Sequence, residues 1–583
     1  MLGLLRNLAP YLRRHRRVFL LGLAMVLVSN VATTLSPRFL QQAIDGLGAG
    51  GGRAAVLAPL GWMVAVAALG GWCRYLMRLH LNGGSREVEL DLRNALFAHL
   101  LRLSPAFYDR SPTGDLMART TNDLLAVRMV AGPALMYLVD TVVRAALVIP
   151  AMLAVSPPLT GLALIPLLGL PVAMVTLGQR IHHRSLAIQD HFGEITRHVH
   201  EHLAGVRVVR AYRQEEAETR RFEALNEEYV RRNLALARAQ GAFHPILTML
   251  GGLGGTVVLG VGGALVVEGR ISVGALIAFS VYLGLLVWPM IALGWAVNLF
   301  QRGQAAFVRI RAILDEQPAI TDPAAPSALP PHTGARRVTF EHVWFRYPNA
   351  ADRGWVLQDV SFDVPAGQSL AVVGATGAGK STLVELLVRS YDPDRGRILL
   401  DGVDIRQLPL AELRAAVGVV PQETFLFSEP LRANVLLGSP DDGRLEAIAE
   451  TSQLAEALPA LPQGWDTLLG ERGINLSGGQ KQRAAIARAL AKAPPVFALD
   501  DALSAVDAHT EARILRALRG ALAGRTSLVV SHRMAAAREA AQVLVLEEGR
   551  VVEAGPPDAL LAAGGRFASL ARQQALEEEV EAV

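Results

Sequence analysis

The stretch SLAVVGATGAGKSTLVELLVRS, residues 369–390, decides the fold of the second half of this chain. A short apolar run of strand character leads into a glycine-rich loop, which leads into residues with the spacing of a helix. The loop at residues 374–381 matches G-x-x-x-x-G-K-[ST] in the strand-loop-helix context that this motif requires. Such a loop turns backbone N–H groups onto phosphate oxygens. The stretch therefore predicts an α/β domain that binds a nucleotide.

Each residue type in the loop suits one part of a nucleotide. The glycines let the backbone approach the phosphates, Lys380 reaches the β and γ phosphates, and the Ser381 hydroxyl ligates Mg²⁺. The run VFALDD at residues 496–501 reads as a buried strand that ends in carboxylates, of which Asp500 supports the Mg²⁺ shell. The residues expected to bind ATP in the loop are Gly374, Thr376, Gly377, Gly379, Lys380, Ser381 and Thr382.

A second anion site is expected at residues 476–480, where LSGGQ opens a helix. A hydroxyl and bare backbone N–H groups at a helix N-terminus attract phosphate. Because the first loop already binds the phosphates of one nucleotide, this site is expected to close over a nucleotide held by another copy of the domain. The residues that would do so are Ser477, Gly478, Gly479 and Gln480.

The first half of the chain has the composition of a membrane domain. Hydrophobic residues make up 51% of the whole sequence and charged residues only 19%, which is too apolar for a wholly soluble protein. Six apolar runs approach the ~20 residues that a helix needs to cross a bilayer. The expected spans are residues 18–37, 54–75, 131–155, 159–178, 243–267 and 274–300.

Arginine placement indicates the orientation of these spans. The N-terminal segment and the connections at residues 78–128 and 180–238 are rich in arginine, so both termini and both long connections are expected in the cytoplasm. The connections show helical spacing, which predicts that the spanning helices continue into the cytoplasm. The expected parts are a membrane domain with an interfacial N-terminal helix at 1–315, a linker at 316–335, a nucleotide-binding domain at 336–575 and an acidic tail at 576–583.

With these motifs in one chain, the sequence resembles an ATP-binding cassette (ABC) exporter half-transporter of the multidrug or lipid exporter type, with the type IV exporter fold. The likeness covers essentially the whole chain, and LSGGQ is its most specific part. The resemblance implies six transmembrane helices fused to one α/β P-loop ABC domain, with ATP and Mg²⁺ as ligands. It also implies an ATPase coupled to transport, in which each ATP lies between the phosphate loop of one half and the LSGGQ of the other.

The resemblance assigns further residues. Tyr347 matches the aromatic residue that stacks on adenine, Gln422 the loop glutamine that reaches Mg²⁺, and His532 the histidine that contacts the γ-phosphate. Asp507 matches a loop that contacts the opposite domain. The segments FYDRSPTGDLMARTTND and GVRVVRAYRQEE resemble those whose short coupling helices dock on nucleotide-binding domains. The implied catalytic residues are Asp501, His532 and Gln422, and the implied metal ligands are Ser381, Gln422 and Asp500.

Asp501 departs from the family pattern, which has a glutamate directly after the strand-end aspartate. That carboxylate orients the water that attacks the γ-phosphate. An aspartate retracts the carboxylate by roughly 1.3 Å, and a misplacement of about 1 Å can cost on the order of 10²-fold in rate. We therefore expect this site to bind ATP and to hydrolyse it slowly, unless a backbone adjustment restores the geometry. The chain thereby resembles the degenerate-site subunit of a heterodimeric bacterial exporter.

The function expected from this resemblance is ATP-driven export of an amphipathic or hydrophobic drug, lipid or peptide across the bacterial cytoplasmic membrane. The expected partner is a second half-transporter with a glutamate in the place of Asp501, and a homodimer is the alternative. A regulatory protein gated by ATP and an importer with the same fold also stay open. The six spans exclude a soluble cassette ATPase of DNA repair or translation, and no nucleic-acid partner is expected.

The cargo is not identified by the sequence. Asp140 and Arg144 lie one helical turn apart within the third expected span. Charges at membrane depth usually face a cavity or each other. The pair is therefore either an internal structural pair or a contact for the cargo, and both alternatives stay open at this point.

Overall fold

The computed structural model describes residues 2–331, 334–503 and 508–581. Two compact units make up the chain. The first comprises Met1–Leu101 and Gly114–Glu316, and the second comprises Arg102–Thr113 and Gln317–Val583. The second unit thus takes a short piece from within the helical half of the sequence.

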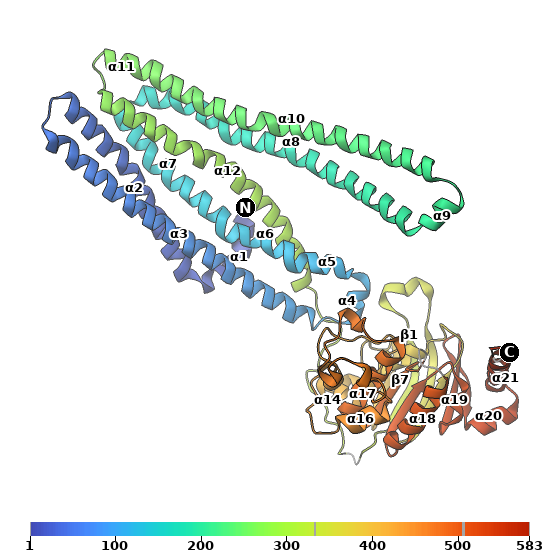
Figure 1. Ribbon diagram of the computed structural model, residues 1–583. Helices are drawn as coiled ribbons and strands as arrows, with labels where there is room; N and C mark the ends of the chain where they lie inside the picture. Colours follow the sequence, from blue (N-terminus) through green and yellow to red (C-terminus); the bar gives the residue numbers. More distant parts are fainter. Residues whose placement is uncertain (1, 332–333, 504–507, 582–583) are drawn as a thin grey trace. The chain divides into compact units, whose positions relative to one another are not determined.

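The first unit is built from long helices (Figure 1). The described residues include six helices that are long and apolar enough to cross a membrane, as the sequence predicts. Four are single helices: α2 (Arg16–Gly48), α3 (Arg53–Leu100), α8 (Pro157–Ala204) and α12 (Val273–Leu314). The third span combines α5 (Thr113–Ala118), α6 (Leu124–Met129) and α7 (Leu135–Val155) through π-helical turns, and the fifth combines α10 (Glu215–Val257) and α11 (Gly263–Val267). A short amphipathic helix, α1 (Leu2–Arg14), precedes them.

The helices run well beyond the apolar stretches, as expected from the spacing of the polar connections. α3 and α8 are 48 residues long each, more than twice the ~20 that a bilayer requires. Residue 37 was expected to end the first span, but Pro37 lies inside α2, which continues to Gly48. Helices in membranes tolerate proline because neighbouring groups satisfy the freed backbone.

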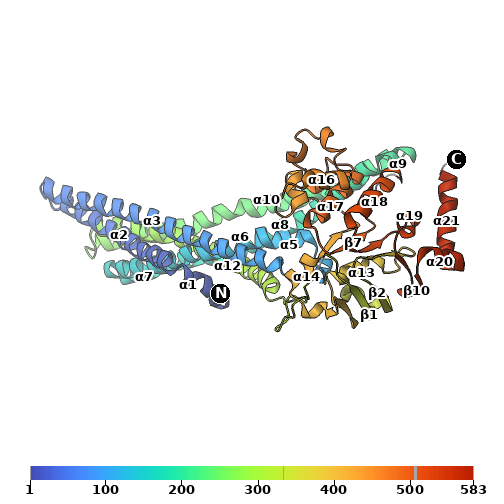
Figure 2. The same ribbon diagram turned by 90° about the horizontal axis from the view of Figure 1, so that it is seen from below.

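α8 and α10 form an antiparallel hairpin whose ends are joined by α9 (Val206–Ala211), and both views show the two helices side by side (Figures 1 and 2). Side chains bind the backbone across the pair. The His191 ring nitrogen Nε2 donates to the Leu225 carbonyl at 2.8 Å, and Arg232 Nη1 donates to the Ala187 carbonyl at 2.9 Å. These bonds attach the two helices to each other far from the apolar core.

The charged pair in the third span belongs to a closed polar network. Arg144 contacts the Asp140 carboxylate at 3.1 Å, and its Nε donates to Asn30 Oδ1 at 2.8 Å. The Asn30 amide in turn donates to Asp140 Oδ1 at 2.8 Å. Every member therefore has a partner inside the unit, and the network joins α2 to α7. This arrangement supports the structural alternative for the pair over a contact with cargo.

The second unit contains two sheets. A four-stranded antiparallel sheet has the order β2-β1-β4-β5, and a six-stranded sheet has the order β10-β9-β3-β8-β7-β6, in which only β10 is antiparallel to its neighbour. The strands of the first sheet are β1 (Val338–Phe345), β2 (Leu357–Val364), β4 (Arg395–Leu400) and β5 (Val403–Asp404). Those of the second are β3 (Ser369–Val373), β6 (Val417–Val420), β7 (Val496–Asp500), β8 (Thr526–Val530), β9 (Gln542–Glu547) and β10 (Arg550–Gly555).

Helices cover the six-stranded sheet and enclose its apolar core. β7 is buried along its whole length, as a continuous apolar run in a parallel sheet predicts. The helices after the first phosphate loop are α13 (Lys380–Leu387), α14 (Leu410–Ala416), α15 (Leu431–Leu436), α16 (Leu445–Thr451), α17 (Gly478–Lys492), α18 (Ala508–Leu522), α19 (Met534–Arg538), α20 (Pro557–Ala563) and α21 (Arg566–Glu581). The α/β P-loop fold predicted from the sequence is confirmed.

The segment at residues 316–335, expected as a linker, has no regular helix or strand among its described residues. It is nevertheless attached to the second unit. The Ser327 N–H donates to the Gln407 carbonyl at 2.8 Å, and the Leu329 N–H donates to Glu412 at 3.2 Å. The segment therefore follows the surface of the nucleotide-binding half through specific backbone bonds.

We predict that Asn30→Ala lowers the stability of the helical unit. The change leaves the buried Arg144 and the half-buried Asp140 with one partner fewer each, at a cost of about 1–3 kcal/mol. Thermal unfolding of the purified protein in detergent, followed by circular dichroism, measures the shift. Thr256→Ala removes an exposed hydroxyl that bonds only within its own helix, and it should leave the midpoint unchanged. Equal midpoints for wild type and Asn30→Ala contradict the structural role of the network.

Candidate functional site

Three adjacent parallel strands deliver functional residues to one edge of the six-stranded sheet. β3 pairs in parallel with β8, and β8 pairs in parallel with β7. The carboxyl ends of parallel strands meet at one edge, which is where ligands bind in open α/β sheets. Gly374 follows β3, His532 follows β8, and Asp500 ends β7. Residues that lie far apart in the sequence are thereby brought together.

A cavity of about 340 Å³ lies at this edge. Its wall also contains Ala350, Val356 and Val530, which the sequence analysis did not single out. The predicted site residues that line it are Tyr347, Thr376, Gly377, Gly379, Lys380, Ser381, Thr382, Gln422, Asp500, Asp501 and His532.

The glycines of the loop are required by its geometry. Gly374 has φ 155°, and a Cβ atom there would lie 2.1 Å from the Leu546 carbonyl oxygen. Gly379 has φ 98°, and a Cβ atom there would lie 2.8 Å from the Leu357 side chain. Gly377 has φ 81° beside open space, so the backbone conformation alone favours glycine there. The loop can therefore take this path only with little or no side chain at these points.

Lys380 is buried and folds back over the loop. Its Nζ donates to the carbonyl oxygens of Gly374 at 2.9 Å and Ala375 at 2.8 Å. Burial lowers the pKa of Lys380, while the carboxylates of Asp501 and Asp500 act in the opposite direction. Phosphate oxygens entering the cavity would add negative charge beside the ammonium, which favours its charged form.

Ser381 and Asp500 form a pair of oxygen donors. The Ser381 hydroxyl donates to Asp500 Oδ1 at 2.9 Å. Burial raises the pKa of Asp500, and the bond from Ser381 opposes that rise. Hydroxyl, carboxylate and amide oxygens suit Mg²⁺, and Gln422 in the same wall can supply the amide oxygen. The donor set present therefore fits a magnesium ion bound together with phosphate.

The backbone of Asp501 is held firmly in place. Its N–H donates to the Val530 carbonyl at 2.9 Å, one step beyond the β7–β8 pairing, and its φ of 45° lies in the left-handed region. Aspartate tolerates this region better than most residues do. Since the backbone is bonded to β8, it has little freedom to move forward and make up for a shorter side chain.

His532 lines the same cavity at the end of β8. Burial, followed by the charge of Lys380, lowers the pKa of His532. The imidazole is therefore neutral near pH 7, with one nitrogen that donates and one that accepts a hydrogen bond. A neutral ring of this kind can donate a hydrogen bond to a phosphate oxygen without adding a second buried charge next to the lysine.

Tyr347 follows β1 and is fixed on two sides. Its hydroxyl donates to Glu385 Oε2 at 2.7 Å and lies 3.0 Å from the Thr382 hydroxyl. Its ring meets Phe345 and Tyr391 edge to face, with centroids 5.0 and 5.4 Å away. Burial raises the pKa of Tyr347, so the hydroxyl stays protonated and remains a donor. The ring is thus held rigidly in the cavity wall beside the phosphate loop.

The LSGGQ segment is not part of this cavity. Ser477 caps α17: its hydroxyl accepts from the Gln480 N–H at 3.3 Å, while the Gln480 side chain accepts from the Ser477 N–H at 2.9 Å. Ser477 and Gly478 are exposed, and none of the residues from Ser477 to Gln480 lines the nucleotide cavity. Asp507, also assigned by the resemblance, lies outside the described residues. The structure therefore brings the first phosphate loop and the strand-end aspartates together but leaves the second anion site apart.

A short helix from the helical half of the sequence belongs to the second unit. α4 (Pro105–Arg110) receives two hydrogen bonds from it. Tyr391 donates to Asp109 Oδ2 at 2.7 Å, and the Asn349 amide donates to the Ala106 carbonyl at 2.8 Å. The resemblance marked the segment around Asp109, but no sequence signal marked Tyr391 or Asn349, because only the folded sheet brings them to α4.

We predict that Tyr347→Ala weakens ATP binding by about 1 kcal/mol, roughly fivefold, because one aromatic stack on adenine is lost. Tyr347→Phe keeps the ring and removes only the hydroxyl, so it serves as the matched control and should stay close to wild type. Equilibrium binding of a fluorescent ATP analogue to the purified full-length protein gives both affinities. If Tyr347→Ala binds as tightly as Tyr347→Phe, the ring does not contact the base.

Comparison with known proteins identifies both halves of the chain. Residues 19–290 match the ABC transporter transmembrane region family, and residues 357–504 match the ABC transporter family. The chain is 37% identical to the probable multidrug resistance ABC transporter ATP-binding/permease protein YheI of Bacillus subtilis (strain 168), over 99% of this chain and 98% of that protein. It is 35% identical to the multidrug resistance-like ATP-binding protein MdlA of Escherichia coli (strain K12), over 98% and 97% of the two chains.

A solved structure agrees with these relatives. The structure of a bacterial Atm1-family ABC exporter with ATP bound aligns with a TM-score of 0.77 and 29% identity, over 97% of this chain and 98% of that one. The agreement extends over both the helical unit and the nucleotide-binding unit. This chain therefore belongs to the ABC transporter family, as a multi-pass membrane ATPase coupled to transport that carries one transmembrane region and one ATP-binding domain.

Proposed function

We propose that this chain is one half of an ATP-driven exporter that moves an amphipathic or hydrophobic compound, such as a drug, lipid or peptide, out of the cytoplasm. The multidrug names of its relatives and the ATP-bound exporter that it resembles support this direction and this class of cargo. The arginine-rich connections support an orientation with the nucleotide-binding half in the cytoplasm of a bacterium.

The observation that carries the proposal of a partner is the separation of the two anion sites. Lys380 and Ser381 line a cavity, whereas Ser477 and Gly478 are exposed outside it at the start of α17. A helix N-terminus of this kind favours phosphate. A second half-transporter would therefore supply the ATP over which this helix closes, and would cover the nucleotide bound in this chain's own cavity.

The exposure of α9 supports the same conclusion. None of its residues is buried. The side chain of Val208 is 61% exposed, and that of Tyr212, the residue directly after α9, is 75% exposed. Apolar side chains at the tip of a polar hairpin gain free energy when a partner covers them. We infer that α9 docks on the nucleotide-binding domain of the partner, whereas α4 is bonded within this chain's own second unit.

We further propose that the two ATP sites of the assembly are unequal. In this chain's cavity Lys380 would neutralise the phosphates, and His532 would donate to the γ-phosphate. The carboxylate of Asp501 would lie too far from the attacking water to orient it. Mg²⁺, when bound by Ser381 and Asp500, would neutralise charge on the β and γ phosphates. A partner with glutamate at the position of Asp501 would provide the fast site, which Ser477 of this chain completes.

We predict that Asp501→Glu speeds ATP hydrolysis in this chain when it is purified alone and pairs with itself. Both sites of such a dimer contain Asp501, and the added methylene returns the carboxylate towards the water, a gain on the order of 10²-fold. Steady-state release of phosphate at saturating ATP measures the rate. A wild-type homodimer that is already fast, with no gain in Asp501→Glu, contradicts the proposed defect.

We predict unequal effects of two substitutions in the complex with the native partner. Ser477→Arg should abolish most ATPase activity because it obstructs the fast site, while Asp501→Asn should leave most of it intact. Asp442→Asn changes an exposed surface aspartate in the same unit and controls for loss of charge. Equal losses from Ser477→Arg and Asp501→Asn, or a native complex that contains only this chain, favour a symmetric homodimer.

A further inference from the structure

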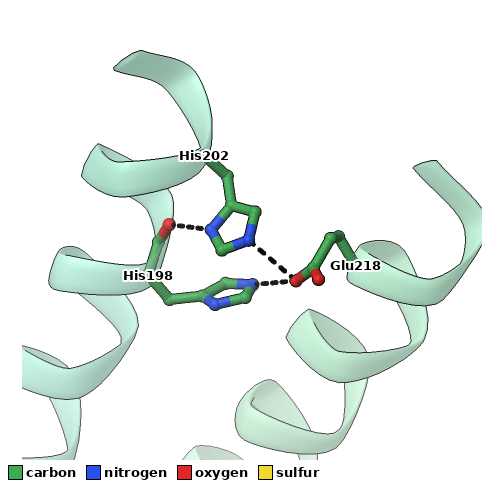
Figure 3. Close-up of side chains that lie close together, drawn as sticks. All are labelled: His198, His202 and Glu218. Atoms are coloured by element: carbon green, nitrogen blue, oxygen red, sulfur yellow. Dashed lines mark hydrogen bonds and ion pairs between the residues drawn. The ribbon is translucent and has the colours of Figure 1, made fainter. Parts of the chain in front are cut away.

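Two histidines and a glutamate converge near the α9 end of the α8–α10 hairpin (Figure 3). His198 and His202 lie one turn apart on α8, and Glu218 lies in the first turn of α10. His202 Nε2 is 2.8 Å and His198 Nε2 is 3.7 Å from the same oxygen, Glu218 Oε2. Residues of these types on two different elements form a potential ligand set that the ATP site does not use.

The hydrogen bond behind His202 determines which of its nitrogens carries the proton. Nδ1 lies 2.7 Å from the carbonyl oxygen of His198, and since a carbonyl can only accept, Nδ1 must donate. In the neutral ring, Nε2 then holds a lone pair and faces a carboxylate oxygen that also carries lone pairs. Two acceptors at 2.8 Å repel each other unless a cation lies between them or the ring is fully protonated.

The two rings and the carboxylate form one compact group. The rings of His198 and His202 have centroids 4.1 Å apart, so one ion beside the carboxylate can reach a nitrogen of each ring. Glu218 Oε2 is buried and accepts no hydrogen bond of normal geometry from the residues that the structure describes. A single cation bound to both ring nitrogens and to this oxygen removes the repulsion and satisfies the buried atom together.

The dimensions suit a transition-metal ion. The three ligand atoms lie within 4.8 Å of one another. Around a tetrahedral metal with ligands at about 2.0–2.2 Å, neighbouring ligand atoms are roughly 3.3–3.6 Å apart. His202 Nε2 and Glu218 Oε2, which are 2.8 Å apart, would separate slightly on binding, and His198 Nε2, 3.7 Å from the same oxygen, would need little change. The bond from His202 Nδ1 to a backbone carbonyl is the arrangement that orients metal-bound histidines. Two imidazoles and one carboxylate leave a fourth position for water, as in three-ligand zinc sites.

We propose that His198, His202 and Glu218 bind one divalent transition-metal ion of the Zn²⁺ class. The ion links α8 to α10 close to α9, beyond the bonds that His191 and Arg232 already make between the two helices. It therefore clamps the end of the hairpin that presents α9. This inference goes beyond the proposed function, and it holds whether the chain pairs with itself or with a different half.

The test uses the full-length protein after removal of any polyhistidine tag, with Co²⁺ as an optical probe and Zn²⁺ as its competitor. Wild type should bind one Co²⁺ per chain with the visible absorption of a four-coordinate site, and Zn²⁺ should displace it. His198→Ala, His202→Ala and Glu218→Gln should each weaken binding at least about tenfold. His200→Ala, which removes an exposed histidine from the same turn, is the matched control and should bind as wild type does.

Two results overturn the proposal. One is the absence of stoichiometric Co²⁺ or Zn²⁺ binding to wild type, which would leave the cluster as a simple ion pair between imidazolium and carboxylate. The other is binding that is equally strong in Glu218→Gln and His202→Ala, which would place the metal elsewhere. Neither result depends on ATPase activity, so the outcome stays separate from the test of unequal ATP sites.

Discussion

The parallel pairing of β3 with β8 and of β8 with β7 is the constraint on which the ATP site depends. It places the phosphate loop, the strand-end aspartates and His532 at one edge of the sheet. The same pairing holds Asp501 through its N–H bond to Val530. In the proposed mechanism, this rigid support leaves the length of the Asp501 side chain to set how far its carboxylate reaches, so the one methylene that separates aspartate from glutamate matters. In a flexible loop the same substitution would matter less.

Contacts within the second unit connect this edge to the short helix between two membrane spans. Tyr347 lines the cavity, its ring meets Tyr391 edge to face at 5.4 Å, and Tyr391 donates to Asp109 of α4 at 2.7 Å. Burial raises the pKa of Tyr391, so the hydroxyl stays a donor and the bond is retained. The chain continues directly from α4 into α5, the start of the third span. Tyr347 in the cavity wall is thus two contacts away from α4.

The helical unit contains two polar groups that differ in how their charges are satisfied. In the third span, Arg144 and Asp140 are satisfied by each other and by Asn30, so the network stabilises helix packing. At the end of the α8–α10 hairpin, His202 donates from Nδ1 to a backbone carbonyl, and its Nε2 lies 2.8 Å from Glu218 Oε2. The first group is satisfied by its own members, whereas the second is the group to which we assign a bound metal ion. This difference is the reason for giving the first group a structural role and the second a binding role.

The sequence by itself determined the architecture and most of the ATP site. Six apolar runs of bilayer length predict six spans, because a helix of that length satisfies its own backbone and presents apolar side chains to lipid. The phosphate loop, Asp500 and LSGGQ are recognisable because each motif consists of residues that are close together in the chain. The helix ends were less predictable: Pro37 lies inside α2, and a proline in a membrane helix need not end it.

Tertiary structure alone decided which distant residues meet. Nothing in the sequence joins Asn30 to Arg144, Tyr391 to Asp109, or His202 to Glu218, because each contact depends on the register of helices or strands that are paired over long separations. The sequence predicts a second anion site at Ser477, and the structure shows Ser477 as an exposed N-cap of α17 outside the cavity. The sequence shows which functional side chains the protein has, while the packing of its helices and strands determines which of them share a site.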